Sequence, residues 1–101
     1  MSKEERKSEV FSTRELTKEE EKIFKEIVNI AKDFEIDGKP VEIKTPQDNI
    51  YGDVGFDSLG GVEFCMHLEH KMKIKFKTKD IANFMFVYDI IDEIKKIKNI
   101  Q

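Results

Sequence analysis

A serine at the start of a predicted helix is the residue of this sequence best placed to take part in chemistry. Ser58 follows Asp57, and the turn before them contains Gly55, which supplies the freedom of φ that a tight turn needs. Asp57 is a good N-cap because its carboxylate can accept hydrogen bonds from the free N–H groups of the first helical turn. A phosphate on the Ser58 hydroxyl would meet such N–H groups and the positive end of the helix dipole. The pattern therefore predicts a serine that carries a phosphate or a phosphodiester.

The residues around Ser58 argue against catalysis by its own hydroxyl. They read G-F-D-S-L-G, which lacks the G-x-S-x-G spacing of a nucleophile elbow. His67 and His70 lie further along the same predicted helix, out of reach of the hydroxyl, so neither would act as a general base. We therefore predict no catalytic residue and a protein that is not an enzyme.

A metal site at the same helix is the next alternative. Cys65, His67 and His70 are close in sequence, and Glu63 could share an ion with the two histidines. However, Cys65 falls on the predicted core side of the helix, and no second cluster completes a tetrahedral site. We predict no metal, a small buried cysteine and two histidines on a solvated face.

The first predicted helix starts at Thr17, which forms a capping box with Glu20. A start at Ser12, paired with Glu15, fits the same motif less well. The apolar residues that follow the helical period are Ile23, Phe24, Ile27, Val28, Ile30, Ala31 and Phe34.

A long loop is predicted after this helix. Gly38 and Pro40 end the helix, and residues 36–54 show no helical stripe. Loops of this length in a small domain are functional or held by anchors. The expected anchors are Val41, Ile43, Ile50 and Tyr51.

The second predicted helix runs from Ser58 to about Met72 and has two apolar stripes. At 100° per residue, one stripe faces the core and consists of Phe64, Cys65, Leu68 and Met72. The other consists of Leu59, Val62 and Met66, with Glu63, Glu69 and His70 at its margin. An exposed apolar strip with a charged margin is a candidate docking surface. The alternative is that Leu59 and Val62 pack under the loop.

The segment after this helix is ambiguous. Lysine occupies every second position from 71 to 79, which taken alone predicts a strand with one solvent-exposed face.

A short third helix is predicted from about Thr78 to Asn83, capped by Thr78, and a fourth from about Val87 to Lys98. The fourth has an apolar stripe of Val87, Ile90, Ile91, Ile94 and Ile97.

The sequence around Ser58 resembles the acyl carrier protein family. That family carries D-S-L after a glycine turn, followed by V-E, and the matching residues here are Gly55, Asp57, Ser58, Leu59, Val62 and Glu63. Downstream apolar positions also fall where carrier proteins place their core without a gap: Phe64, Cys65, Leu68, Met72, Phe76, Ile81, Phe84, Val87, Ile91 and Ile94. The resemblance covers roughly Thr17 to Lys98 and is weakest between Phe34 and Ile50.

The resemblance implies an all-α fold, a four-helix bundle of acyl-carrier type. Three longer helices and a short third helix surround one core, and a long loop joins the first two helices. It also implies that the lysine-rich segment is a loop held to the core by Phe76 rather than a strand, since a lone strand would lack a partner for its backbone groups.

The resemblance further implies that Ser58 carries a covalent 4′-phosphopantetheine arm that holds acyl intermediates as thioesters. Asp57 would shape the attachment turn. The implied docking patch for partner enzymes consists of Leu59, Val62, Glu63 and Met66, with His70 at its edge. The implied partners are a phosphopantetheinyl transferase and acyl-chain-processing enzymes such as ketosynthases and acyltransferases.

The pathway is expected to be fatty-acid or related lipid synthesis. A specialised polyketide, non-ribosomal peptide or amino-acyl pathway is the alternative, and a small helical protein-interaction module is the alternative from another class. Gly60 and Gly61 stand where typical fatty-acid carriers have an acidic residue after D-S-L, and carboxylates are few late in this helix. We expect slower, less salt-sensitive docking on strongly basic enzymes, and close approach of a loop or partner backbone at the glycines.

Composition sets the remaining expectations. The 101 residues predict one carrier domain at 17–98, a flexible lead-in at 1–16 and a tail at 99–101. The net charge of −3 argues against nucleic-acid binding. The five alternating lysines of residues 71–79 do not change this, because no arginine and no aromatic stacking platform accompany them. The first residues lack the apolar core of a signal peptide, and no apolar run is long enough to span a bilayer, so we expect a cytoplasmic monomer without membrane insertion.

Overall fold

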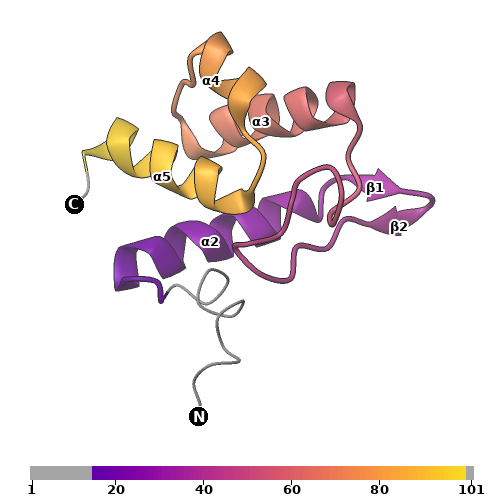
Figure 1. Ribbon diagram of the computed structural model, residues 1–101, viewed down its shortest axis with the longest axis horizontal. Coiled ribbons are helices and arrows are strands. Elements are labelled where there is room, and N and C mark those ends of the chain that lie inside the picture. The colour runs from indigo at the N-terminus through magenta and orange to yellow at the C-terminus, as the bar shows by residue number, and fades with distance from the viewer. Residues whose placement is uncertain (1–14, 100–101) are drawn as a thin grey trace, which may run out of the picture.

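The computed structural model describes residues 15–99, and within them the chain forms four helices and one short hairpin (Figure 1). The helices are α2 (Lys18–Ala31), α3 (Ser58–Met72), α4 (Thr78–Asn83) and α5 (Val87–Lys98), and the hairpin strands are β1 (Glu35–Ile36) and β2 (Lys39–Pro40). The predicted four helices are confirmed. Most of the predicted lead-in, the alternative helix start at Ser12 and most of the tail lie outside the described residues.

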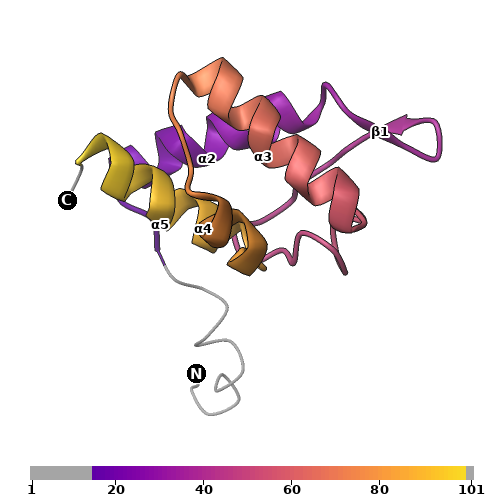
Figure 2. The same ribbon diagram turned by 90° about the horizontal axis from the view of Figure 1, so that it is seen from above.

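Helix α2 packs against both α3 and α5, and the short α4 lies against α3 (Figure 2). Fully buried side chains from the three longer helices meet between them, among them Ile27, Phe64, Leu68, Ile91 and Ile94. The predicted core stripe of α3 is confirmed, because all four of its members are buried. On α5, four members of the predicted apolar stripe are buried, and the fifth, Ile97, is 37% exposed.

The predicted capping box opens α2. The Glu20 backbone N–H donates to Thr17 Oγ1 at 3.1 Å, and the Thr17 N–H donates to Glu20 Oε1 at 3.0 Å. The helix ends at Ala31, before Gly38 and Pro40, which were predicted to end it. The chain then turns into the hairpin, where the Val41 N–H donates to the Phe34 carbonyl at 2.9 Å.

A hairpin forms at the start of the segment that was predicted to be a long loop. Asp37 and Gly38 form its turn with φ of 54° and 79°, the conformation that Asp-Gly favours in two-residue hairpins. Glu35 pairs with Pro40, and Ile36 pairs with Lys39. A strand of two residues is too short to show the alternation of apolar and polar residues that predicts a β-strand. Only the Asp-Gly pair of the turn indicated this hairpin.

The rest of the long loop is tied to the junction between α4 and α5. The Ile50 N–H donates to the Met85 carbonyl at 2.8 Å, and the Val87 N–H donates to the Asp48 carbonyl at 3.0 Å. The predicted anchors are confirmed: Val41, Ile43 and Ile50 are buried, and Tyr51 packs partly buried against the core.

The lysine-rich segment is a loop, as the resemblance implied. Phe76 is buried, its ring meets Phe84 edge to face, and its N–H donates to Glu69 Oε2 at 2.6 Å. The predicted cap of α4 is wrong by one residue: Lys77 is the N-cap, and no side-chain hydrogen bond caps the helix. Ile81 packs partly buried against the core.

Two polar contacts join α2 to the other long helices. Glu20 is buried, and its Oε2 accepts from Lys95 Nζ of α5 at 2.5 Å. Just beyond the other end of α2, Asp33 Oδ2 lies 2.9 Å from His67 Nε2 of α3 and 3.9 Å from Lys71 Nζ. The hydrogen bond from His67 lowers the pKa of Asp33, with a smaller effect of the Lys71 charge in the same direction, while desolvation opposes both.

No helix among the described residues has the length and apolar character needed to cross a bilayer.

Replacing Lys95 should destabilise the bundle. Lys95→Met removes the ammonium group that bonds the buried Glu20 carboxylate, so the free energy of unfolding should fall by about 3 kcal/mol. Lys96→Met is the matched control, because Lys96 is 76% exposed and its 3.8 Å pair with Glu93 should contribute less than about 0.5 kcal/mol. Urea unfolding followed by circular dichroism measures both, and equal losses would contradict the structural role of Lys95.

The Asp33 contact predicts a pH dependence. A carboxyl group with a lowered pKa stabilises the fold above its ordinary value of 3.8, and this contribution is lost as the pH falls through the lowered pKa. Asp33→Asn should therefore unfold more easily than wild type at neutral pH, with the difference closing below pH 3.8. Glu26→Gln on the exposed side of α2 controls for the lost charge. A difference that stays constant with pH would contradict the assignment.

Candidate functional site

Ser58 is exposed and is the first residue of α3, directly after its N-cap. Asp57 Oδ1 accepts from the Gly60 N–H at 2.7 Å, as predicted for a capping carboxylate. The N–H groups of the first helical residues have no intrahelical acceptor, and they lie at the positive end of the dipole of a 15-residue helix. This end of α3 therefore suits a phosphodiester on the Ser58 hydroxyl.

The turn before Ser58 is held by its own side chains. Asn49 Oδ1 accepts from the N–H groups of Tyr51 and Gly52 at 2.8 and 3.0 Å, and Asp53 Oδ2 accepts from the Asn49 N–H at 2.7 Å. Gly55 has a φ of 106°, which a residue with a side chain rarely adopts, so the glycine is required by the turn. A Cβ at Gly55 would lie 3.4 Å from Ile36 Cδ1, which shows that the hairpin packs directly on the turn.

Both glycines after Ser58 make room for close neighbours. A Cβ at Gly61 would lie 3.0 Å from Cε1 and 3.1 Å from the hydroxyl oxygen of Tyr51. A Cβ at Gly60 would lie 3.0 Å from Asp57 Oδ1 and 3.1 Å from Phe56 Cδ1. The expected close approach of a loop is confirmed, and the approaching groups are the Tyr51 ring, the capping carboxylate and Phe56.

The second apolar stripe of α3 faces solvent. Leu59, Val62 and Met66 are 67%, 38% and 56% exposed, so the alternative that Leu59 and Val62 pack under the loop is wrong. Glu63 and His70 are exposed beside them. Between this stripe and α4 lies a groove of about 320 Å³ whose apolar walls include Val62, Met66, Phe76, Ile81 and Ala82.

Cys65 is buried, as predicted, and burial raises the pKa of its thiol to about 12. The prediction of a solvated face holds for His70 but is wrong for His67. The His67 ring is half-buried, contacts Phe34 edge to face at 5.3 Å and is bonded to Asp33. The sequence could not show this contact because Asp33 lies 34 residues away. Among residues 15–99, no three His, Cys, Asp or Glu side chains are grouped to hold a metal ion.

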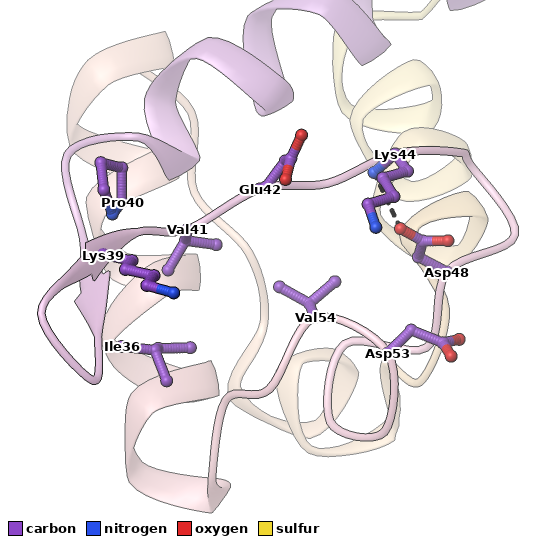
Figure 3. Close-up of a pocket in the computed structure, with 9 residues that line it drawn as sticks. All are labelled: Ile36, Lys39, Pro40, Val41, Glu42, Lys44, Asp48, Asp53 and Val54. Carbon is purple, nitrogen blue, oxygen red and sulfur yellow. Dashed lines mark hydrogen bonds between the residues drawn. The ribbon is translucent and has the colours of Figure 1, made fainter.

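Two further pockets flank the hairpin. One, of about 370 Å³, lies between the hairpin and the long loop, with Ile36, Val41 and Val54 as apolar walls (Figure 3). In this pocket Asp48 Oδ2 accepts from the Lys44 N–H at 2.8 Å, so this carboxylate holds the loop. The other, of about 290 Å³, lies between the hairpin and the start of α3. Sequence reasoning missed both, because the hairpin that forms them was not predicted.

Three comparisons with known proteins agree on the nature of this domain. Residues 25–94 match the family model of the phosphopantetheine attachment site. An acyl carrier protein of Syntrophobacter fumaroxidans (strain DSM 10017 / MPOB) is 38% identical over 61 residues, which are 60% of this chain and 75% of that protein. The crystal structure of an acyl carrier protein from Thermotoga maritima superposes with a TM-score of 0.68 at 24% identity, over 84% of this chain and 96% of that one, which shows the same fold. The chain belongs to the acyl carrier protein family, and its domain is one to which 4′-phosphopantetheine is attached.

Proposed function

We propose that Ser58 is the attachment point of the 4′-phosphopantetheine arm and that the protein carries acyl intermediates on it. The observation that carries this proposal is the exposed Ser58 hydroxyl at the first residue of α3, beside the capped and glycine-shaped turn. When bound, the arm supplies a terminal thiol that forms thioesters with acyl groups. The chain itself presents the hydroxyl, offers backbone N–H groups to the phosphate and keeps the turn in place.

The protein acts as a carrier and not as a catalyst in this proposal. His67, the nearest histidine in sequence, lies nine residues beyond Ser58, which is about 13 Å along a helix. Its Nε2 is also bonded to Asp33. A serine without a base within hydrogen-bond reach is not activated as a nucleophile. The base needed to modify Ser58 therefore comes from the transferase.

Asp57 has two roles in the proposal. Its Oδ1 caps α3 by accepting from Gly60, which fixes the position of the neighbouring serine. The carboxylate is exposed beside the Ser58 hydroxyl, where it can help to position the magnesium ion that a transferase uses with coenzyme A.

Partner enzymes dock on the exposed stripe of α3. Leu59, Val62 and Met66 provide the apolar contact, and Glu63 and His70 lie at its margin. The transferase, ketosynthases and acyltransferases are the proposed partners.

We place the protein in fatty-acid or related lipid synthesis, with specialised polyketide, peptide or amino-acyl pathways as the alternative. The mixed charges late in α3 support weaker salt dependence of docking than in strongly acidic carriers.

Loading with the arm tests the attachment site directly. Incubation with coenzyme A, magnesium and a broad-specificity phosphopantetheinyl transferase should add one phosphopantetheine to the wild-type protein and none to Ser58→Ala, as read by intact mass. Thr78→Ala is the matched control, because it removes an exposed hydroxyl from the first residue of another helix. A wild-type protein that stays unmodified with several transferases, or a Ser58→Ala protein that is loaded, would refute the proposal.

The buried cysteine gives a second test. Cys65 has a pKa of about 12 against an ordinary 9.0, so its thiolate fraction at pH 8 is roughly a thousandfold below that of a free thiol. The native apo-protein should react very slowly with Ellman's reagent, and the loaded protein should react quickly with one equivalent, at the thiol of the arm.

The raised pKa also fixes the sign of an alkaline effect. The neutral Cys65 thiol stabilises the fold fully below pH 9.0, and this contribution is lost as the pH rises toward 12.

In the labelling experiment, fast reaction of the native apo-protein with Ellman's reagent at pH 8 would contradict the burial of Cys65. Unfolded protein in guanidinium, in which Cys65 reacts freely, is the positive control.

A further inference from the structure

Four lysines between α3 and α4 carry charges that the fold does not use. Lys73, Lys75, Lys77 and Lys79 are exposed, and none of them forms an ion pair or a side-chain hydrogen bond within residues 15–99. Neighbouring like charges repel one another, so the fold gains no stability from gathering them here. The lysine-rich loop, residues 73–79, therefore presents cations that are free to meet a partner.

The lysine-rich loop is tied to the core by the residues that alternate with the lysines. Met72 and Phe76 are buried, and Ile74 packs partly buried against the core. The Phe76 N–H donates to Glu69 Oε2 at 2.6 Å, and the Ile74 N–H donates to the Glu69 carbonyl at 3.1 Å. The ammonium groups are thus carried by a backbone that is held in place.

The groove of about 320 Å³ between the exposed stripe of α3 and α4 opens beside this loop. Lys75 lines the groove, and so does Glu69, whose Oε2 already accepts from the Phe76 N–H. The other lining residues are apolar, apart from Thr78. The complementary surface carries an apolar side chain for the groove and a carboxylate for Lys75.

The charge along α3 changes sign from its start to its end. Residues 45–70 contain no lysine or arginine, whereas residues 69–80 contain five lysines and two carboxylates. Met72 lies about 21 Å along the helix from Ser58, and Figure 1 shows the lysine-rich loop at the end of α3 far from the hairpin. A partner that follows the exposed stripe from Ser58 to the groove must therefore be acidic where it reaches the loop.

A protein surface fits these lysines better than an anionic membrane or a nucleic acid. Extended polyanions act on all charges of a protein within a screening distance of about 10 Å or less, and the net charge of this chain is −3. Single carboxylates of a protein partner contact single lysines and leave the acidic parts of the chain uncovered. The apolar groove also needs a side chain to fill it.

We propose that the lysine-rich loop and the adjacent groove dock a cargo-processing enzyme whose surface is acidic at this contact, with Lys75 as the central cation. This inference rests on the proposed docking of partner enzymes on α3. It names the chemistry of the partner at the end of the helix away from Ser58, where a carboxylate-rich enzyme surface replaces a basic one.

The variant Lys75→Glu/Lys77→Glu tests the inference with the ketosynthases and acyltransferases encoded in the same genome. Carriers are loaded with the arm and an acyl group, and KM and kcat are measured at low and high salt. For at least one enzyme, KM for the carrier should rise about 10–30-fold with kcat within about twofold, and the loss should shrink at high salt.

Lys22→Glu/Lys25→Glu is the matched control. Both lysines are exposed on α2 and form no ion pair within the described residues, so the change in net charge is the same. Its KM should differ from that of the wild-type protein by less than about twofold.

Charge reversal on the responding enzyme locates the contact. Aspartates and glutamates around its entrance are changed to lysine one at a time and assayed with both carriers. One of these changes should restore KM for Lys75→Glu/Lys77→Glu and raise it for the wild-type carrier, as expected for two groups in contact.

Three results would overturn the inference. Equal losses in the two double variants would reduce the effect to net charge, and a lower KM of Lys75→Glu/Lys77→Glu with every enzyme would show basic partners. Binding of the wild-type protein to phosphatidylglycerol vesicles or duplex DNA, lost in this variant while every KM is unchanged, would assign the lysines to a membrane or a nucleic acid. Failure of the proposed function is separate, because the wild-type protein would then gain no arm in the loading step.

Discussion

The geometry around Ser58 depends on a short series of backbone hydrogen bonds that fastens the long loop to the helices. The Ile50 N–H donates to the Met85 carbonyl, and the Ile50 carbonyl accepts from the Phe56 N–H at 3.2 Å. Phe56 is two residues before Ser58, so these bonds connect the turn before Ser58 to the junction of α4 and α5. Ile50 and Phe56 are both buried, which protects the bonds from water. Without this connection, α3 could form but its first turn would have no fixed surroundings.

Helix α3 serves the core and the site at once. Its buried stripe packs in the core against α2, while its exposed stripe leaves apolar side chains in solvent. Gly60 and Gly61 lower its helical stability by about 1–2 kcal/mol relative to alanines. In return, the Tyr51 ring and the Asp57 carboxylate come within about van der Waals contact of the helix backbone, which a Cβ would prevent. The turn before Ser58 is therefore packed against the helix that it precedes.

The proposed attachment chemistry uses one exposed hydroxyl, that of Ser58. Cys65, the single cysteine of the sequence, is buried with a raised pKa, so it does not compete with the thiol of the arm. His67 is held by Asp33 and Phe34 and is no base for Ser58.

The sequence by itself determined the four helices, the capping of α2 and α3, the core stripes and the candidate serine, because these depend on local patterns of period 3.6 and on short capping motifs. It also indicated the family through residues adjacent in the chain. Only the tertiary structure decided that Leu59 and Val62 face solvent, that His67 bonds Asp33 and that Lys95 reaches the buried Glu20. It likewise decided that the hairpin packs on Gly55 and lines the pocket at the start of α3. These contacts join residues far apart in sequence, and no local periodicity encodes which distant side chain will fill a given space.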